Sequence, residues 1–170
     1  MLCTERLNIL PYEASFYDDL RLLFCDSQDV MQWALQNRTL HLEEFENLLK
    51  EKFVDEDKPI LGFYGVQTKV HQKIIGVSGL LHCNYLNKED LEFGFILAKE
   101  AWGNGYAQEL GRFWLRYAAD QLKCQRILAT KSPNNLASQK VLDKLKMRFI
   151  RSMQIPQRGQ RNVYLKDLVK

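Results

Sequence analysis

The sequence predicts a mixed α/β domain built on a single sheet. Two kinds of pattern support this: segments in which apolar and polar residues alternate, and segments with apolar residues every three or four positions. They follow one another without an internal repeat, a low-complexity tract or a Pro/Gly/Ser-rich linker. The length of 170 residues suits one well-packed domain, so residues 1–170 are expected to form a single unit. The expected order of elements is β-α-α-β-β-β-α-β-α-β-β.

One strand and two helices are expected in the first third of the chain. Residues 5–12 (ERLNILPY) have the pattern of a strand that a proline ends. Residues 16–26 and 41–53 each place apolar side chains at helical spacing, and Thr39 is a plausible N-cap for the second helix. The segment DEDKP at residues 55–59 is expected to end that helix.

Three strands are predicted next, over residues 60–68, 73–82 and 90–98. The first two are joined by KVHQ, which is short enough for a hairpin connection. In the third strand, residues with odd numbers are expected on one face and residues with even numbers on the other. The two sets are Leu91, Phe93, Phe95 and Leu97, and Glu92, Gly94 and Ile96.

The remaining elements alternate between helix and strand. A helix after Gly105 presents a long apolar stripe, residues 126–131 form a strand, and residues 132–146 form a capped helix. Two terminal strands, 148–154 and 161–167, are expected around a turn at Gly159. The stripe of the first helix is Ala107, Leu110, Trp114, Tyr117, Ala118 and Leu122, and the inward residues of the second are Leu136, Val141, Leu142 and Leu145.

The net charge of +3 conceals an uneven distribution. Residues 1–57 carry 13 acidic and 5 basic side chains, whereas residues 123–170 carry 12 basic and 2 acidic ones. A basic C-terminal third suits an anionic ligand and an acidic N-terminal third suits a cationic one, although both can be solvated faces. The basic residues are not clustered with aromatic residues, so nucleic-acid binding is not expected.

Two further classes of protein are not expected. No run of 18 apolar residues is present, and the first residues lack the basic segment and apolar core of a signal peptide. The four cysteines are scattered without a C-x-x-C pair. This favours reduced thiols in a cytoplasmic setting, away from a membrane.

Two glycines stand directly before the helix that follows the strand at 90–98. A strand, a short G-x-G turn and a helix start together form an arrangement that binds phosphate, because backbone N–H groups can approach an anion there. The loop is neither a Walker loop nor a dinucleotide fingerprint, and a simple tight turn is the alternative. The candidate donors are the amides of Gly103, Asn104, Gly105, Tyr106 and Ala107.

The motif W-G-N-G-Y-A, followed later by S-P-N-N-L-A-S-Q-K-V-L-D-K-L, resembles the GNAT superfamily of acetyl-coenzyme A-dependent N-acetyltransferases. The opening T-E-R-L-N-I-L-P is similar to the branch of ribosomal-protein N-terminal (Rim-type) acetyltransferases. The resemblance implies a GNAT-like mixed, mostly antiparallel sheet flanked by helices. It also implies that the strands at 90–98 and 126–131 splay apart and that coenzyme A enters the wedge.

The resemblance implies roles for particular residues. Phe95 and Leu97 would pair their backbone with the pantetheine arm of acetyl-coenzyme A, Asn135 would hydrogen-bond it, and Ser138 lies one turn further along the same helix face. The loop that would hold the pyrophosphate comprises Trp102, Gly103, Asn104, Gly105, Tyr106 and Ala107, with Trp102 in place of the more usual Gln or Arg.

Acetyl transfer to an amine requires a neutral nucleophile, donors for the developing oxyanion and a proton for the leaving thiolate. Glu92 is the candidate general base, acting through a water molecule, and a surface glutamate is the alternative. A backbone N–H near Leu97 would serve the oxyanion. The tyrosine that many relatives use as acid is replaced by Leu142, which leaves Ser138 to hydrogen-bond the sulfur unless it is only a helix-packing serine.

The predicted function is transfer of acetyl from acetyl-coenzyme A to a primary amine, either a peptide N-terminus or a small cationic amine such as a polyamine or aminoglycoside-like compound. The acidic N-terminal helices favour a cationic acceptor. The helix end K-L-K-M lacks the glycine that relatives carry there, and with the missing tyrosine it motivates an inactive coenzyme A-binding regulatory domain as alternative. A binder of another nucleotide is a second alternative, and the protein is expected to be a monomer or homodimer.

Three other groups of residues receive a plainer interpretation. His82 beside Cys83 has no second ligand pair at suitable spacing, so no metal site is expected. Trp33 is expected in the core together with three other aromatic residues, namely Phe53, Phe63 and Tyr64. Tyr85, just after a predicted strand, could reach an acceptor cleft.

Overall fold

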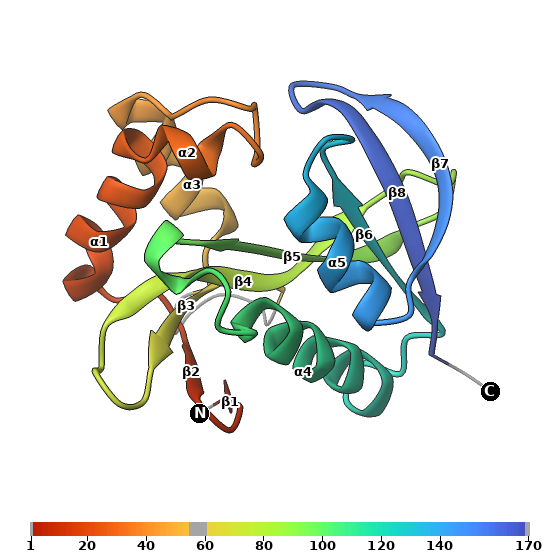
Figure 1. The fold of residues 1–170 in the computed structure, drawn as a ribbon, viewed down its shortest axis with the longest axis horizontal. Coiled ribbons are helices and arrows are strands. Elements are labelled where there is room, and N and C mark those ends of the chain that lie inside the picture. Colours follow the sequence, from red (N-terminus) through yellow and green to blue (C-terminus); the bar gives the residue numbers. More distant parts are fainter. Residues whose placement is uncertain (1, 55–60, 169–170) are drawn as a thin grey trace.

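The computed structural model describes residues 2–54 and 61–168. Its centre is one eight-stranded sheet with the order β1-β2-β3-β4-β5-β6-β8-β7, antiparallel throughout except between β5 and β6 (Figure 1). The mixed α/β class with a mostly antiparallel sheet is therefore confirmed. The strands are β1 (Leu2–Cys3), β2 (Leu7–Leu10), β3 (Gly62–Thr68), β4 (Ile74–Cys83), β5 (Asp90–Leu97), β6 (Arg126–Lys131), β7 (Arg148–Ile155) and β8 (Gly159–Asp167).

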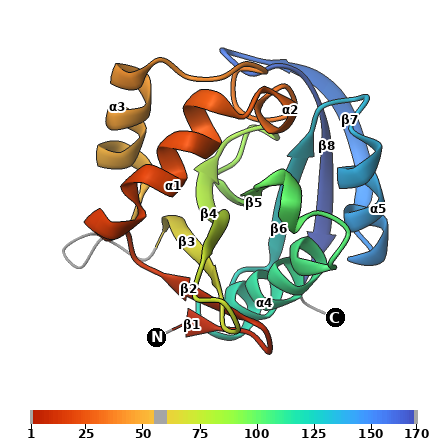
Figure 2. The same ribbon diagram turned by 60° about the vertical axis from the view of Figure 1, so that its left-hand side comes forward.

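The helices lie on the two faces of this sheet. The N-terminal group covers one face, and the group from the second half of the chain covers the other (Figures 1 and 2). The first group is α1 (Tyr17–Arg21), α2 (Gln28–Met31) and α3 (Leu42–Lys52), and the second is α4 (Tyr106–Asp120) and α5 (Leu136–Lys144). No helix among the described residues is long and apolar enough to cross a membrane. All four cysteines are free.

Two large hydrophobic cores result, one on each face, and a smaller cluster forms around Leu128, Val163 and Leu165. The odd-numbered residues of β5, such as Phe93 and Leu97, pack with α4 and α5, whereas Ile96 packs with the N-terminal helices. The predicted alternation of this strand is thus confirmed. Trp114 of α4 is fully buried and donates from Nε1 to Ser78 Oγ at 2.9 Å, and Ser78 donates to the carbonyl of Gly94 at 2.9 Å. This buried relay ties α4 to both β4 and β5.

The predicted helix over 16–26 is not one regular helix. A 3₁₀ turn (Ala14–Phe16) precedes α1, and a π-helical segment (Leu22–Asp26) follows it. The short helix α2 and the strand β1 were not predicted from the sequence, because segments of two to four residues carry no recognisable period. The DEDKP segment lies outside the described residues.

Thr39 is not the N-cap of α3, which was the sequence-based expectation. The helix begins at Leu42 with His41 as N-cap, and the backbone N–H of His41 donates to Glu44 Oε2 at 2.8 Å. The start of α3 is defined by this bond to Glu44, the third helical residue. The bond outweighs the intrinsic preference of threonine for the N-cap position.

The helix α5 departs from the predicted pattern at both ends. Leu136, expected to point inward, is 71% exposed because it stands in the first turn, while Leu142 and Leu145 are buried as predicted. At the other end Lys146 adopts φ +56° and its N–H donates to Asp143 O at 2.9 Å. A lysine in the left-handed conformation therefore closes the helix where glycine is usual.

Two facing glycines in the sheet give opposite predictions for stability. A Cβ added at Gly79 would lie 1.8 Å from the carbonyl oxygen of Gly62, a backbone atom held in the β3–β4 ladder. We expect Gly79→Ala to lower the free energy of unfolding by about 3 kcal/mol or more, since β3 and β4 must separate. The measurement is urea unfolding followed by circular dichroism.

The control is the register partner of that glycine, Gly94 on β5. A Cβ at Gly94 would make ordinary contacts at 3.7 Å with Phe63 and 3.8 Å with Leu81. We expect Gly94→Ala to change stability by less than about 1 kcal/mol. Equal effects of the two substitutions would contradict the close approach of β3 and β4 at Gly79.

Candidate functional site

The sheet opens between β5 and β6. A single parallel bridge, Glu92 to Leu128, joins the two strands, and beyond it they diverge toward their C-terminal ends. The predicted splay is confirmed. Two side-chain contacts hold the junction: Arg126 makes a bidentate ion pair with Asp90 at 2.7 Å, and Thr130 donates to Glu92. Side chains therefore replace backbone bonds where the ladder ends.

The edge of β5 that faces this opening carries backbone groups without a neighbouring strand. The N–H of Ala98 donates to Ile75 on β4 at 2.8 Å. Because successive residues of a strand direct their backbone groups to alternate sides, those of Phe95 and Leu97 face the opening. The carbonyl of Leu97 accepts from Trp102 Nε1 at 2.8 Å. Within the described residues, the backbone of Phe95 has no strand partner on that side.

The glycine loop at the end of β5 leads into the N-terminus of α4. Gly103 and Gly105 have φ of +76° and +79°, a left-handed conformation that favours glycine. A Cβ at Gly103 would meet nothing within 4 Å, and one at Gly105 would find only Arg6 Nη2 at 3.6 Å. The loop backbone is thus open rather than packed. The first-turn N–H groups of α4 have no acceptor within the helix, so the loop can receive an anion.

The loop is braced by residues that lie far away in the sequence. Arg6 donates from Nη1 to the carbonyl of Asn104 at 2.9 Å, pairs with Glu109 at 2.6 Å and lies 4.7 Å from the ring centre of Tyr106. Burial alone would raise the pKa of Glu109, but hydrogen bonds from Thr4 and Arg6 outweigh it and lower that pKa. No local pattern predicts this brace, because it joins residues about a hundred positions apart.

One cavity of 620 Å³ passes through the opening and reaches both faces of the sheet. Most of the predicted site residues line it: Glu92, Phe95, Leu97, Trp102, Gly103, Gly105, Tyr106, Ala107, Asn135 and Ser138. Asn104 does not, because its side chain turns back to donate to the carbonyls of Ala101 and Trp102. The structure therefore brings together residues from β5, the loop, α4 and α5.

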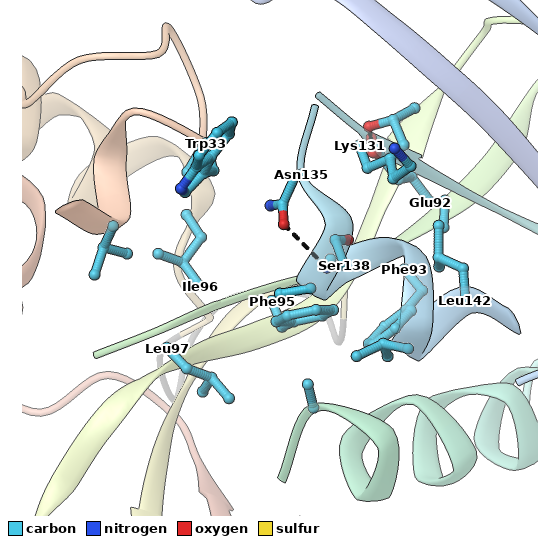
Figure 3. A pocket seen from close by; sticks show the side chains of 18 of the residues that line it. Trp33, Glu92, Phe93, Phe95, Ile96, Leu97, Lys131, Asn135, Ser138 and Leu142 are labelled. Atoms are coloured by element: carbon cyan, nitrogen blue, oxygen red, sulfur yellow. Dashed lines mark hydrogen bonds between the residues drawn. The ribbon is translucent and has the colours of Figure 1, made fainter. Parts of the chain in front are cut away.

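The far wall of the cavity is the corner between β6 and α5. Asn135 caps α5 by accepting from the backbone N–H of Ser138 at 3.0 Å, and Figure 3 shows both residues beside Phe95. Lys131 is buried and donates from Nζ to the carbonyls of Ser132 and Pro133. Burial lowers the pKa of Lys131. No motif in the sequence marks this lysine as a site residue.

Glu92 is the centre of a polar network at the other end of β5. It accepts from Tyr85 Oη at 2.7 Å, from Thr130 and from Arg158 Nη1 at 3.1 Å. Burial and then the neighbouring Glu92 raise the pKa of Tyr85, which keeps its hydroxyl protonated. Burial would lower the pKa of Arg158, but its interaction with Glu92 outweighs this and raises it. Tyr85 also lines the cavity.

A second buried arginine lies beside this network. Arg161 of β8 is 1% exposed and donates from Nη2 to the carbonyl of Leu35 at 2.9 Å and to Asn37 Oδ1 at 2.8 Å. Burial, and then repulsion from Arg158, lower its pKa to about 10. Both arginines line the cavity.

The N-terminal helices contribute apolar rather than acidic groups to the cavity. The described residues from this part that line it are Val30, Trp33, Ala34, Leu35, Leu48 and Lys52. No described carboxylate from the acidic third lies among them, so the expectation of an acidic acceptor cleft is not met. Trp33, expected in the core, lines the cavity instead (Figure 3), whereas Phe53, Phe63 and Tyr64 are core residues as predicted. No group of described His, Cys, Asp and Glu residues is suited to hold a metal ion.

Comparison with known proteins adds to this geometry. The family model described as "Acetyltransferase (GNAT) domain" matches residues 6–148. Over 81 residues the chain is 31% identical to the uncharacterized protein YkkB of Bacillus subtilis, which covers 48% of this chain. The alignment spans 47% of that relative, about half of its length.

Solved structures share the fold over nearly the whole chain. A GNAT-family acetyltransferase from Bacillus anthracis is 22% identical, with a TM-score of 0.79 and 98% of each chain covered. RimL, a ribosomal L7/L12 alpha-N-protein acetyltransferase solved with coenzyme A, is 15% identical with a TM-score of 0.77, covering 96% of this chain and 95% of its own. Spermidine N-acetyltransferase from Vibrio cholerae, solved with coenzyme A and spermine, is 18% identical with a TM-score of 0.74 and 96% of both chains covered.

Proposed function

The chain belongs to the GNAT acetyltransferase family, and on this premise we propose that residues 1–170 form one domain that transfers acetyl from acetyl-coenzyme A to a primary amine. One observation carries the proposal. The open edge of β5 and the exposed backbone of the glycine loop meet in a single cavity that crosses the sheet. A thioester bound from the side of α4 and α5 would then be accessible to an amine from the opposite face.

The proposed binding site for acetyl-coenzyme A uses backbone groups. The amides from Gly103 to Ala107 would hold the pyrophosphate, and the free backbone of Phe95 would pair with the pantetheine arm. Asn135 would hydrogen-bond the same arm through its side-chain nitrogen, because its oxygen caps α5. Trp102 would act by tying the loop to the end of β5. Acetyl-coenzyme A supplies the activated acetyl group.

Three residues are proposed to serve the reaction itself. Glu92 is the carboxylate that lines the cavity within the described residues, and it would take the proton of the amine directly or through water. The N–H of Leu97 faces the opening and would donate to the carbonyl oxygen as negative charge develops. The Ser138 hydroxyl would hydrogen-bond the leaving sulfur, since Leu142 occupies the place of the usual tyrosine.

The proposal also includes the Rim-type branch of the family and a cytoplasmic location. The likeness to RimL supports the proposal that this chain is of the Rim type. The likeness to the spermidine enzyme supports a small amine as its acceptor. Both are named as acetyltransferases of amines, so an amine acceptor is the common expectation. The four free cysteines support a reducing, cytoplasmic setting.

The activity is tested by release of free thiol from acetyl-coenzyme A in the presence of a panel of amines and peptides. We expect release that depends on the amine and saturates with acetyl-coenzyme A. Binding of acetyl-coenzyme A without turnover on any amine would favour a regulatory coenzyme A-binding domain. Displacement of acetyl-coenzyme A by equimolar ATP or NAD would instead favour a general nucleotide binder.

The loop assignment is tested by Gly105→Glu. A side chain at φ +79° is strained, and its negative charge would stand where the pyrophosphate is proposed to bind. We expect the dissociation constant of acetyl-coenzyme A, measured by calorimetry, to rise at least about 100-fold. Gly159→Glu is the matched control, because Gly159 also has a left-handed φ of +72° but lies outside the loop. Wild-type affinity of Gly105→Glu would refute the assignment.

The role of Glu92 is tested by Glu92→Gln, which keeps the shape and removes the charge. We expect kcat to fall about 100-fold at neutral pH, with unchanged affinity for acetyl-coenzyme A and an altered acid limb of the kcat/KM profile. The control is Glu100→Gln, an exposed carboxylate just beyond β5. A lower kcat with an unaltered pH profile would assign Glu92 to holding Arg158 in place rather than to proton transfer.

A further inference from the structure

The cavity that crosses the sheet is strongly cationic. Its described lining residues include one carboxylate, that of Glu92, and six Lys and Arg side chains. Three of these, Lys52, Lys140 and Lys144, are exposed at the rim. Of the other three, Lys131 and Arg161 are buried and Arg158 is partly buried, and Glu92 is the carboxylate that acts on the two arginines.

Arg161 has no carboxylate partner within the described residues. All of its acceptors are neutral: the carbonyls of Gln160 and Leu35 and the side-chain oxygen of Asn37. A cation that is 99% buried without a direct ion-pair partner is costly, and the pKa of this guanidinium is lowered because burial and the repulsion from Arg158 outweigh the attraction of Glu92. An anion that enters the cavity would relieve this cost.

Arg158 is only partly satisfied. Its two terminal nitrogens bind Glu92, Tyr85 and Thr130, but its buried Nε has no acceptor among the described residues. A buried donor without a protein acceptor is uncommon, so Nε is free to donate to a ligand. The single negative charge of Glu92 therefore stands against two adjacent arginines, which leaves a net positive charge.

The two arginines lie on the acceptor side of the opening. Arg161 binds the 35–37 segment of the N-terminal part, and Asn37 Nδ2 also donates to the carbonyl of Arg158 at 3.2 Å. The glycine loop lies at the other end of β5, since Glu92 and Leu97 are five residues apart, roughly 16 Å along a strand. The positive charge here is thus separate from the proposed pyrophosphate site.

We propose that the acceptor is a small amine that also carries an anionic group, a carboxylate or a phosphate, which Arg158 contacts and which the buried charge of Arg161 attracts from behind. The inference rests on the proposed acetyl transfer and names the class of its acceptor. A compact molecule fits because Arg158, the more accessible of the two arginines, lines the cavity, so amine and anion must both enter it. The apolar wall of Trp33, Leu81 and Ile96 would contact the rest of the molecule.

Matched pairs of amines test the proposal in the thiol-release assay. One pair is L-phenylalanine and L-phenylalaninamide, and the other is phosphoethanolamine and ethanolamine, so the two pairs distinguish carboxylate from phosphate. We expect kcat/KM for the anionic member of at least one pair to be about 10- to 100-fold higher. A carboxylate raises the pKa of its own amine, so the fraction of free base favours the amide and cannot produce this preference.

Variants of Arg161 test whether the preference for anionic amines depends on this residue. Arg161→Met removes the charge at similar length, and we expect it to lower the phenylalanine-to-phenylalaninamide ratio of kcat/KM at least about tenfold. Arg161→Lys should keep part of the ratio. Arg148→Met, an exposed arginine on the neighbouring strand, is the control and should leave the ratio unchanged. Because the ratio does not depend on the fraction of folded enzyme, a loss of folded protein in the variant would not change it.

A binding measurement separates failure of this inference from failure of the proposed function. With coenzyme A present, calorimetry compares N-acetyl-L-phenylalanine with N-acetyl-L-phenylalaninamide and N-acetylphosphoethanolamine with N-acetylethanolamine. Tighter binding of an anionic member supports the site even if no amine is acetylated. Thiol release that is as fast with spermidine or the neutral members as with the anionic ones would overturn the inference and leave the acetyl transfer standing. Equal binding, or no binding, of both members of both pairs would also overturn it.

Discussion

The junction between β5 and β6 is the constraint on which the rest of the molecule depends. A sheet normally satisfies its backbone groups strand by strand, but here one parallel bridge is followed by divergence. The junction is held by side chains: Arg126 pairs with Asp90 before the bridge, and Thr130, beyond it, donates to Glu92, which is itself the bridge residue on β5. The same separation leaves the edge of β5 free for a ligand and creates the passage through the sheet.

The two faces of the sheet contribute different groups to the cavity. On the face of α4 and α5, the glycine loop presents backbone amides and is stiffened by Arg6, Trp102 and Glu109. On the opposite face, the N-terminal helices supply an apolar wall, and the β7–β8 hairpin supplies two arginines. A ligand that enters from one face can therefore meet a ligand from the other only at the opening in the sheet.

Charge counts along the chain are a poor guide to charge within the cavity. The first third is strongly acidic, yet none of its carboxylates that the structure describes lines the cavity, and some make exposed ion pairs, such as Asp29 with Lys99 and Asp26 with Arg21. Exposed pairs of this kind are solvated and contribute little. Arg161, by contrast, is a single residue in a basic segment whose effect is large because it is buried. The charge of the site therefore depends on which charged side chains are buried in it, and a count along the sequence does not show this.

The sequence by itself determined the elements and the outline of the site. Periodicity placed β5, β6 and α4, and the two glycines located the loop at the end of β5, because alternation and left-handed turns are local properties. The local signals failed where the outcome depends on packing or on distant partners, as with Trp33, Leu136 and the N-cap of α3. Only the tertiary structure decided that Arg6 braces the loop and that Glu92 is held by Tyr85, Thr130 and Arg158. It also decided that Arg161 is buried without an ion-pair partner among the described residues, since each of these environments is formed by residues that only the folded chain brings together.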